Sequence, residues 1–406
     1  MVDNTRTKKK LNKAQRLMLL RLCRAYRTAP TAALQVLSGV LPLHIRAKEE
    51  MWKWHLKNGG IIDNQNSEIY KYIQIGLFPN LNEYLLNTLK SNLKEEMITN
   101  KLHPSLTEDI KVTDYNDDPI SQFRIFTDGS KNNSKVGSAF VVRDSKDNIS
   151  YKACFKLADV CTITQAELFA ILQAAKHINK TKIKNKHIKI CSDSQAAIKR
   201  IVNNKGTLAT LIRNEINSTN NKVTFSWIKG HSGNEGNNMA DFMAKQAATS
   251  NVTPSYWEVS YIIIKNVIHN TAIQIWQREW EEGETGRTTF RFFPDISTRL
   301  RNKNFNTNFY TTQIITDHGN FQYYLHRFGH RDHPLCECDH TSIQNAYHLI
   351  FDCFKFDDQR TALERIVLEK GFNWPCPMKI LVEDKDIFAT LENFIKNTGA
   401  LEPSFS

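Results

Sequence analysis

Two spacings of apolar residues mark residues 121–250 as the most regular part of the chain. Alternating stretches rich in β-branched and aromatic residues predict five strands, which end near Asp128, Arg143, Leu157, Asp193 and Ile228. Runs rich in alanine with helical spacing predict helices at 163–177 and 238–247. A polar turn at 144–148 joins the second and third strands, so the first three form an antiparallel meander. The pattern predicts an α/β fold.

Helical patterns dominate the flanking regions. Residues 11–26 read as a basic amphipathic helix, and two shorter helices follow before residue 58. Residues 256–280 fit a helix that is broken or bent near Asn270. We therefore expect five segments: a basic helical segment at 1–60, a connector at 61–120, an α/β domain at 121–250, a helical region at 251–330, and a Cys/His-containing C-terminal region with helices at 331–406.

Four acidic residues lie at the ends of predicted strands or near the starts of predicted helices within residues 121–250. Asp128 and Asp193 each end a predicted strand, while Glu167 and Asp241 lie early in the two helices. Sites in open α/β sheets form beyond the strand ends. Converging carboxylates repel one another, and burying them without a partner is costly. Mg²⁺ relieves the conflict, because a few carboxylates, water and phosphate oxygens hold it in proteins. The sequence thus predicts Mg²⁺, with Mn²⁺ as a substitute.

This site would suit phosphodiester hydrolysis. Two cations about 3.5–4 Å apart stabilise both the attacking and the leaving oxygen of a phosphoryl displacement. His231, in the glycine-rich stretch 230–236, is a candidate proton carrier. Four further residues flank the carboxylates and are candidates to contact ribose 2′-hydroxyls: Gly129, Ser130, Ser194 and Gln195. A lone Asp-Gly-Ser is usually a turn, so the prediction rests on the whole ordered set.

Positive charge is concentrated in two parts of the chain. The net charge is +12, and Lys and Arg outnumber Asp and Glu by 13 to 3 in residues 1–60 and by 20 to 9 in 121–250. These parts are the ones expected to meet nucleic acid. Six lysines lie between residues 176 and 189, and such a run is usually a solvated face, although it could also follow a substrate backbone.

The remaining composition favours an intracellular protein, in the nucleus or the cytoplasm. No stretch of about 18 apolar residues predicts a membrane span, so no membrane partner is expected. The basic start is not followed by the apolar core of a signal peptide. Eight cysteines are too dispersed for a disulfide framework, which indicates a reducing compartment.

Four of the potential metal ligands cluster near the C-terminus. Cys336, Cys338, His348 and Cys353 have the spacing C-x-C-x9-H-x4-C, and three thiolates with one imidazole can complete a tetrahedral Zn²⁺ site. The alternative is three buried cysteines and an exposed histidine. His340 competes as a ligand but lies close to Cys338. The zinc would be structural or would help to bind nucleic acid.

Four motifs resemble type 1 ribonuclease H. They are Phe-Thr-Asp-Gly-Ser at 126–130, Thr-Gln-Ala-Glu at 164–167, Ser-Asp-Ser-Gln at 192–195 and the stretch from Trp227 to Asp241, in the family's order. The resemblance implies a five-stranded mixed sheet flanked by helices, with Asp128, Glu167, Asp193 and Asp241 as metal ligands. It also implies that His231 assists proton transfer or product release. Asn238 stands where relatives often have Glu, outside the four carboxylates.

Two other stretches resemble insect non-LTR retrotransposons. Residues 15–43 look like the segment that follows the polymerase core, around the thumb, and 319–325 resemble another motif of the same elements. These elements also carry a Cys-x-Cys…His…Cys cluster downstream of their ribonuclease H domain, which supports His348 as the ligand. The resemblance implies a C-terminal piece of a polyprotein, with its reverse transcriptase as a partner. The polymerase's own paired-aspartate motif is absent from this sequence.

The sequence therefore predicts a metal-dependent endonuclease that hydrolyses the RNA strand of RNA–DNA hybrids. The main alternative is a catalytically inactive, nucleic-acid-binding remnant of a retrotransposon. A nuclease or recombinase of the same broad fold would fit the Thr-Asp-Gly-Ser and Gly-His-Ser-Gly motifs less well. A zinc-dependent interaction module would leave the carboxylates unexplained.

Overall fold

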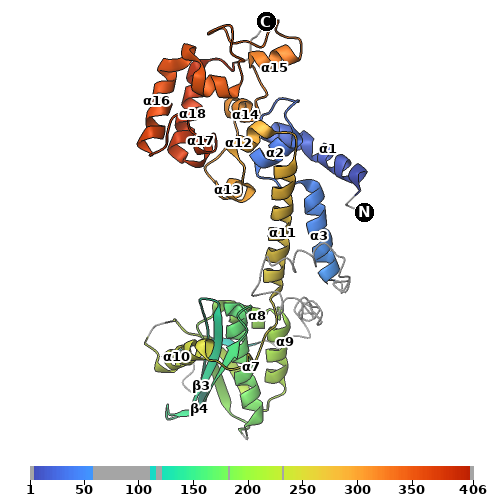
Figure 1. The fold of residues 1–406 in the computed structure, drawn as a ribbon. Helices are drawn as coiled ribbons and strands as arrows, with labels where there is room; N and C mark the ends of the chain where they lie inside the picture. The colour runs from blue at the N-terminus through green and yellow to red at the C-terminus, as the bar shows by residue number, and fades with distance from the viewer. Residues whose placement is uncertain (1–3, 58–109, 116–120, 182, 231–232, 403–406) are drawn as a thin grey trace. The chain divides into compact units, whose positions relative to one another are not determined.

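The chain forms two compact units in a computed structural model (Figure 1), which describes residues 4–57, 110–115, 121–181, 183–230 and 233–402. One unit combines residues 1–51 with 269–406, and the other comprises 52–268. Segments from both ends of the sequence thus share one unit, which the five-segment division did not anticipate. Most of the predicted connector lies outside the described residues. Within them, no helix is both long and apolar enough to cross a bilayer.

The unit of residues 52–268 is built on a six-stranded mixed sheet in the order β1-β6-β5-β2-β3-β4. The strands β1, β6, β5 and β2 pair in parallel, and β2, β3 and β4 form the predicted antiparallel meander. Their bounds are β1 Val112–Asp114, β2 Phe123–Asn132, β3 Lys135–Arg143, β4 Ile149–Leu157, β5 His187–Ser192 and β6 Lys222–Trp227.

The prediction of five strands was wrong by one. The additional strand, β1, is three residues long and pairs in parallel with β6, Val112 opposite Phe225. Three residues cannot display an alternating pattern, so only pairing with β6 reveals the strand. The first predicted strand also runs on past Asp128 to Asn132, because β3 continues to pair with it after β5 has stopped.

Helices cover both faces of this sheet. Neighbouring residues of β3 point to opposite faces: Val141 packs in a cluster with Ala240 of α10, whereas the Phe140 ring lies 5.6 Å from that of His177 on α7. A capping box of Thr162 and Gln165 begins α7, and Asn234 caps α10. The bounds of the helices are α7 Ile163–Lys180, α8 Gln195–Val202, α9 Thr207–Asn217 and α10 Glu235–Thr249.

The same unit continues beyond the boundary predicted at residue 250. The backbone N–H of Ala158 donates to the Tyr256 carbonyl at 2.9 Å, and the Gln165 side chain donates to the Glu258 carbonyl at 3.0 Å. These contacts attach the segment after α10 to the start of α7. Helix α11, Tyr261–Glu282, follows without interruption, so the break predicted near Asn270 does not occur.

The other unit is helical. In addition to the C-terminal part of α11 it contains a π-turn at His348–Asp352 and a short 3₁₀ turn at Phe354–Phe356. Helix α3 begins in this unit and extends beyond residue 51. The helices are α1 Thr5–Leu22, α2 Thr31–Ser38, α3 Leu43–Lys57, α12 Arg287–Phe292, α13 Ile296–Arg301, α14 Phe309–Thr316, α15 Gln322–Arg327, α16 Asp357–Glu369, α17 Ile380–Glu383 and α18 Lys385–Thr398.

A polar triad joins the two ends of the sequence inside this helical unit. Glu279 of α11 accepts a hydrogen bond from Lys8 Nζ at 2.7 Å and lies 2.9 Å from Nε2 of the buried His44. Burial by itself raises the pKa of Glu279, but the bonds from His44 and Lys8 outweigh it and lower the pKa to about 2 from 4.5. The ionised carboxylate is therefore favoured by folding.

We predict that strong acid removes the contribution of Glu279 to the stability of the helical unit. Its pKa is depressed in the folded chain, so its contribution is complete above about pH 4.5 and is lost as the pH falls towards 2. Thermal unfolding of the wild type and Glu279→Gln between pH 3 and 7 should differ most at the upper end. Glu282→Gln, at an exposed position on the same helix, is the control. A difference that is constant with pH would contradict the prediction.

Candidate active site

Three of the four predicted carboxylates converge at one edge of the sheet. Asp128 comes from β2, Glu167 from α7 and Asp193 from the residue after β5, and one oxygen of each lies within 4.8 Å of the others. The parallel pairing of β2 with β5 ends at Thr127 and Ser192. The next residue of each strand is therefore delivered to the same place, which is how two distant aspartates meet.

Gly129 allows the helix that carries Glu167 to approach β2. A Cβ atom at residue 129 would lie 2.6 Å from the Glu167 nitrogen and 2.8 Å from the Ala166 carbonyl carbon, which are backbone atoms with little freedom to move. The backbone N–H of Gly129 also donates a hydrogen bond to the Glu167 carboxylate. The glycine next to Asp128 is thus required by packing at the site.

Two of the three converging carboxylates are buried and incompletely satisfied, whereas Asp193 is half-buried. Asp128 is 5% exposed and Glu167 is 6% exposed. In the described parts of the chain, Asp128 Oδ2 and Glu167 Oε2 have no hydrogen-bond partner. Burial, followed by the charges of Asp193 and Asp241, raises the pKa of Asp128 to about 8; burial and Asp128 raise that of Glu167. Oxygen ligands with unused lone pairs and this repulsion fit a hard divalent cation.

Asp241 lies beside this group rather than within it. It projects from α10 with a side chain that is 24% exposed, and its Oδ2 accepts a hydrogen bond from Lys245 Nζ at 2.7 Å. Its charge nevertheless contributes to the raised pKa of Asp128 and of Glu167. The predicted proton carrier, His231, lies outside the described residues.

Two neighbours of Asp193 were not singled out by the sequence analysis. Trp227, the last residue of β6, donates its indole N–H to the Asp193 carbonyl at 3.0 Å. A Cβ at Gly230 would lie 2.9 Å from Asp193 Oδ2, so the chain after β6 passes directly over that carboxylate. The Trp227–Gly230 part of the fourth motif was a sequence signal for this contact.

The predicted ribose contacts differ in accessibility. Ser130 is buried, and Gly129 is half-buried against α7. Ser194 caps α8 by accepting from the Ala197 N–H, while Gln195 is exposed at the first position of that helix. Of this set, Gln195 presents the most accessible polar side chain.

The lysine run is not uniformly a solvated face. Lys180, Lys184 and Lys186 are exposed, as a solvated face requires, but Lys189 is 1% exposed. Its Nζ donates to the Tyr115 carbonyl at 3.2 Å. The interpretation of the run as a solvated face is therefore wrong at Lys189, because the pleat of β5 turns that side chain inwards.

The four predicted zinc ligands also lie together, in the helical unit. One donor atom from each of Cys336, Cys338, His348 and Cys353 lies within 4.8 Å of the others. Cys336 and Cys353 sulfurs are 3.7 Å apart, and Cys338 Sγ is 3.3 Å from His348 Nε2. Burial and then the neighbouring thiols raise the pKa of Cys338 to about 12. Crowded thiols and an imidazole form a donor set that fits Zn²⁺. The structure does not bring His340 into this group.

Fold and acidic cluster define the class of the sheet-containing unit: an α/β domain with carboxylates at the parallel strand ends, as in a nuclease of the ribonuclease H kind. A family model described as RNase H matches residues 121–249. These residues therefore form an RNase H domain. The crystal structure of RNase H1 from Halobacterium salinarum is 16% identical, with 31% of this chain and 96% of that chain covered and a TM-score of 0.27.

The chain's homologues are Pol polyproteins of insect R1 non-LTR retrotransposons. A retrovirus-related Pol polyprotein from a type-1 retrotransposable element R1 of Nasonia vitripennis is 28% identical, over 32% of this chain and 33% of its own length. A putative 115 kDa protein in the R1DM element of Drosophila melanogaster is 30% identical, over 27% of this chain and 11% of its own length. The chain thus spans about a third or less of these relatives.

We predict that removing one carboxylate stabilises the metal-free protein. At pH 8.5, above the raised pKa of Asp128, the acids repel, so Asp128→Asn should raise the free energy of unfolding by roughly 1–3 kcal/mol, a typical single-mutant range. It should also abolish the rise in melting temperature that Mg²⁺ causes in the wild type. Asp159→Asn, with an exposed surface ion pair in the same domain, should change neither. A less stable metal-free Asp128→Asn would contradict the repulsion.

We predict that the Cys/His cluster retains one zinc ion per chain. Elemental analysis after purification should find zinc in the wild type and in Cys154→Ser, whose cysteine is exposed and outside the cluster. Cys353→Ser should lose the zinc and melt at a lower temperature, because metal-binding free energy is part of the folding free energy. Full zinc content in Cys353→Ser would rule out this ligand set.

Proposed function

We propose that this chain is a divalent-cation-dependent endonuclease that hydrolyses the RNA strand of RNA–DNA hybrids. The observation that carries the proposal is the convergence of Asp128, Glu167 and Asp193, with unsatisfied buried oxygens, inside an RNase H domain. An RNase H domain implies a nucleic-acid substrate, and the chain's homologues are retrotransposon polyproteins. Both fit an enzyme that removes RNA from a newly copied hybrid.

The carboxylates would act as ligands for Mg²⁺ or Mn²⁺. Two bound cations would activate the attacking water and stabilise the leaving oxygen. Asp128, Glu167 and Asp193 would hold the ions, and Asp241, whose Oδ2 accepts a hydrogen bond from Lys245, would complete the set from α10. Because Asp128 and Glu167 are shielded from solvent, their positions are fixed before substrate arrives, which is the preorganisation that catalysis requires.

The other predicted groups have supporting roles in this proposal. His231 would carry a proton or aid product release. Gln195, exposed beside Asp193, would donate to a ribose 2′-hydroxyl, the group that distinguishes RNA from DNA. The other three flanking residues, Gly129, Ser130 and Ser194, would contribute backbone or hydroxyl contacts along the same strand.

The helical unit would support the nuclease through a structural zinc site and a basic segment that binds nucleic acid. We propose that Zn²⁺ in the Cys336–Cys353 cluster is structural, since two of its three thiols and its imidazole are buried. The basic 1–60 segment would hold nucleic acid as part of a thumb-like element. The reverse-transcriptase portion of a parent polyprotein would be the partner, and the protein would work inside the cell.

Asp193→Asn tests the proposal directly. The wild type with Mg²⁺ should cut the RNA strand of a labelled hybrid and leave DNA and RNA duplexes intact. The substitution should lower kcat at least about 100-fold, the scale of loss for a group that stabilises transition-state charge. Asp159→Asn, a carboxylate outside the site, should cleave like the wild type. A well-folded wild type that binds hybrid without cutting it would instead be the inactive, nucleic-acid-binding remnant.

A further inference from the structure

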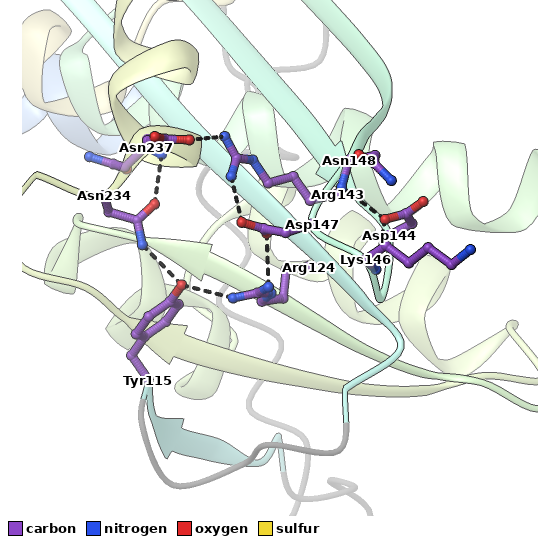
Figure 2. Close-up of polar contacts among 10 residues, drawn as sticks. Tyr115, Arg124, Arg143, Asp144, Lys146, Asp147, Asn148, Asn234 and Asn237 are labelled. Carbon is purple, nitrogen blue, oxygen red and sulfur yellow. Dashed lines mark hydrogen bonds and ion pairs between the residues drawn. The ribbon is translucent and has the colours of Figure 1, made fainter.

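A polar network links the strand missed by the sequence analysis to the start of α10 (Figure 2). Tyr115 directly follows β1 and lies six positions before residue 121, where the RNase H match begins. Its hydroxyl accepts hydrogen bonds from Asn234 Nδ2 at 3.0 Å and from Arg124 NH1 at 3.3 Å. A residue outside the matched domain thus contacts its last helix.

Asn234 uses both ends of its side-chain amide. The oxygen accepts from the Asn237 N–H at 3.2 Å and so caps α10, while the nitrogen donates to Tyr115. The cap determines where the helix begins, and the contact with Tyr115 determines where that cap lies against the sheet. Asp241 is seven residues beyond the cap, about two turns along a helix of 3.6 residues per turn.

A second connection reaches the adjacent residue of the same helix. Arg124 NH2 and Arg143 NH1 each donate to one oxygen of Asp147 at 2.8 Å. Arg143 NH2 then donates to Glu235, the first residue of α10, at 3.1 Å. Figure 2 shows Arg124 shared between this connection and Tyr115. The beginning of α10 is therefore held at two successive positions, Asn234 by Tyr115 after β1 and Glu235 by Arg143 of β3.

Tyr115 is itself fixed by its surroundings. Buried Lys189 donates to its carbonyl at 3.2 Å and lies 6.0 Å from its ring centroid. The ring packs against Phe126, 6.4 Å away, and against the apolar cluster that includes Ala240 of α10. With both the backbone and the ring immobilised, the hydroxyl is a rigid acceptor, although the side chain is only partly buried.

Helix α10 connects this network to the acidic cluster. Asn234 is the N-cap of α10, and the same helix carries Asp241. A shift of Asn234 would therefore move Asp241 relative to Asp128, Glu167 and Asp193, so the position of the cap affects the completeness of the site.

We propose that Tyr115 is a positioning residue for the nuclease: through Asn234 it fixes the N-terminus of α10, and with it Asp241. This inference rests on the proposed function for its consequence, because Asp241 matters only if the carboxylates act together. It assigns a role to a residue that neither the four motifs nor the matched domain includes.

Tyr115→Phe in the full chain isolates the hydroxyl, since the ring remains. Asn234→Ser approaches the same contact from the other side, because serine still caps the helix but has no amide to reach residue 115. Each substitution should lower kcat for hybrid cleavage roughly fivefold, the effect expected from the net free energy of one hydrogen bond. KM for the hybrid should stay unchanged, and the Mg²⁺ concentration for half-maximal activity should rise.

The double variant distinguishes positioning from general destabilisation. If Tyr115 acts through Asn234, Tyr115→Phe combined with Asn234→Ser should be no slower than Asn234→Ser alone. Tyr151→Phe is the matched control, a partly exposed tyrosine of β4 that stacks on His177 away from α10. It should leave kcat, KM and the Mg²⁺ dependence unchanged.

Hydrogen exchange gives a readout that does not require activity. The first-turn amides of α10, including that of Asn237, should exchange faster in Tyr115→Phe than in the wild type or Tyr151→Phe. Unchanged exchange with unchanged kcat, or strictly additive losses of kcat in the double variant, would overturn the positioning role. A wild type that does not cleave hybrid would overturn the proposed function instead, and faster exchange would still establish that Tyr115 holds α10.

Discussion

The repulsion among Asp128, Glu167 and Asp193 is the constraint on which the sheet-containing unit depends. Their close approach raises the pKa of Asp128 and Glu167, with burial as the larger cause, so the folded chain holds a centre that is unfavourable without a cation. The rest of the unit holds these residues in place: parallel pairing aligns two of them, and Gly129 lets α7 deliver the third. Rigid secondary structure thus maintains an arrangement that favours metal binding.

The Cys/His cluster in the other unit follows the same logic with different ligands. Three thiols and an imidazole lie together, with His348 and Cys353 at the π-helical turn and Cys336 and Cys338 from the chain before it, and burial raises the pKa of the Cys338 thiol. Carboxylates suit hard cations that remain open to water and substrate, whereas thiolates suit a closed zinc site. One chain therefore contains two candidate ligand sets, one of carboxylates in the sheet-containing unit and one of thiols and an imidazole in the helical unit.

Elements outside the matched domain complete the nuclease unit. Tyr256 and Glu258 attach the chain after α10 to the beginning of α7, which carries Glu167. On the other side, β1 extends the sheet, and Tyr115 contacts the cap of α10, which carries Asp241. The two helices that carry Glu167 and Asp241, α7 and α10, are thus each contacted by residues outside 121–249. The compact unit is therefore larger than the stretch that the family model matches.

The sequence by itself determined the class of fold and the order of the predicted elements, and it predicted both candidate ligand sets, because strand alternation, helical spacing and the Asp, Glu, Cys and His patterns are local. It did not reveal β1, whose three residues become a strand only by pairing with β6, nor the burial of Lys189, nor the contact between Tyr115 and Asn234. The tertiary structure alone decided these points, and it placed three carboxylates together with Asp241 beside them. Such features depend on contacts between residues far apart in the chain, and no local periodicity records them.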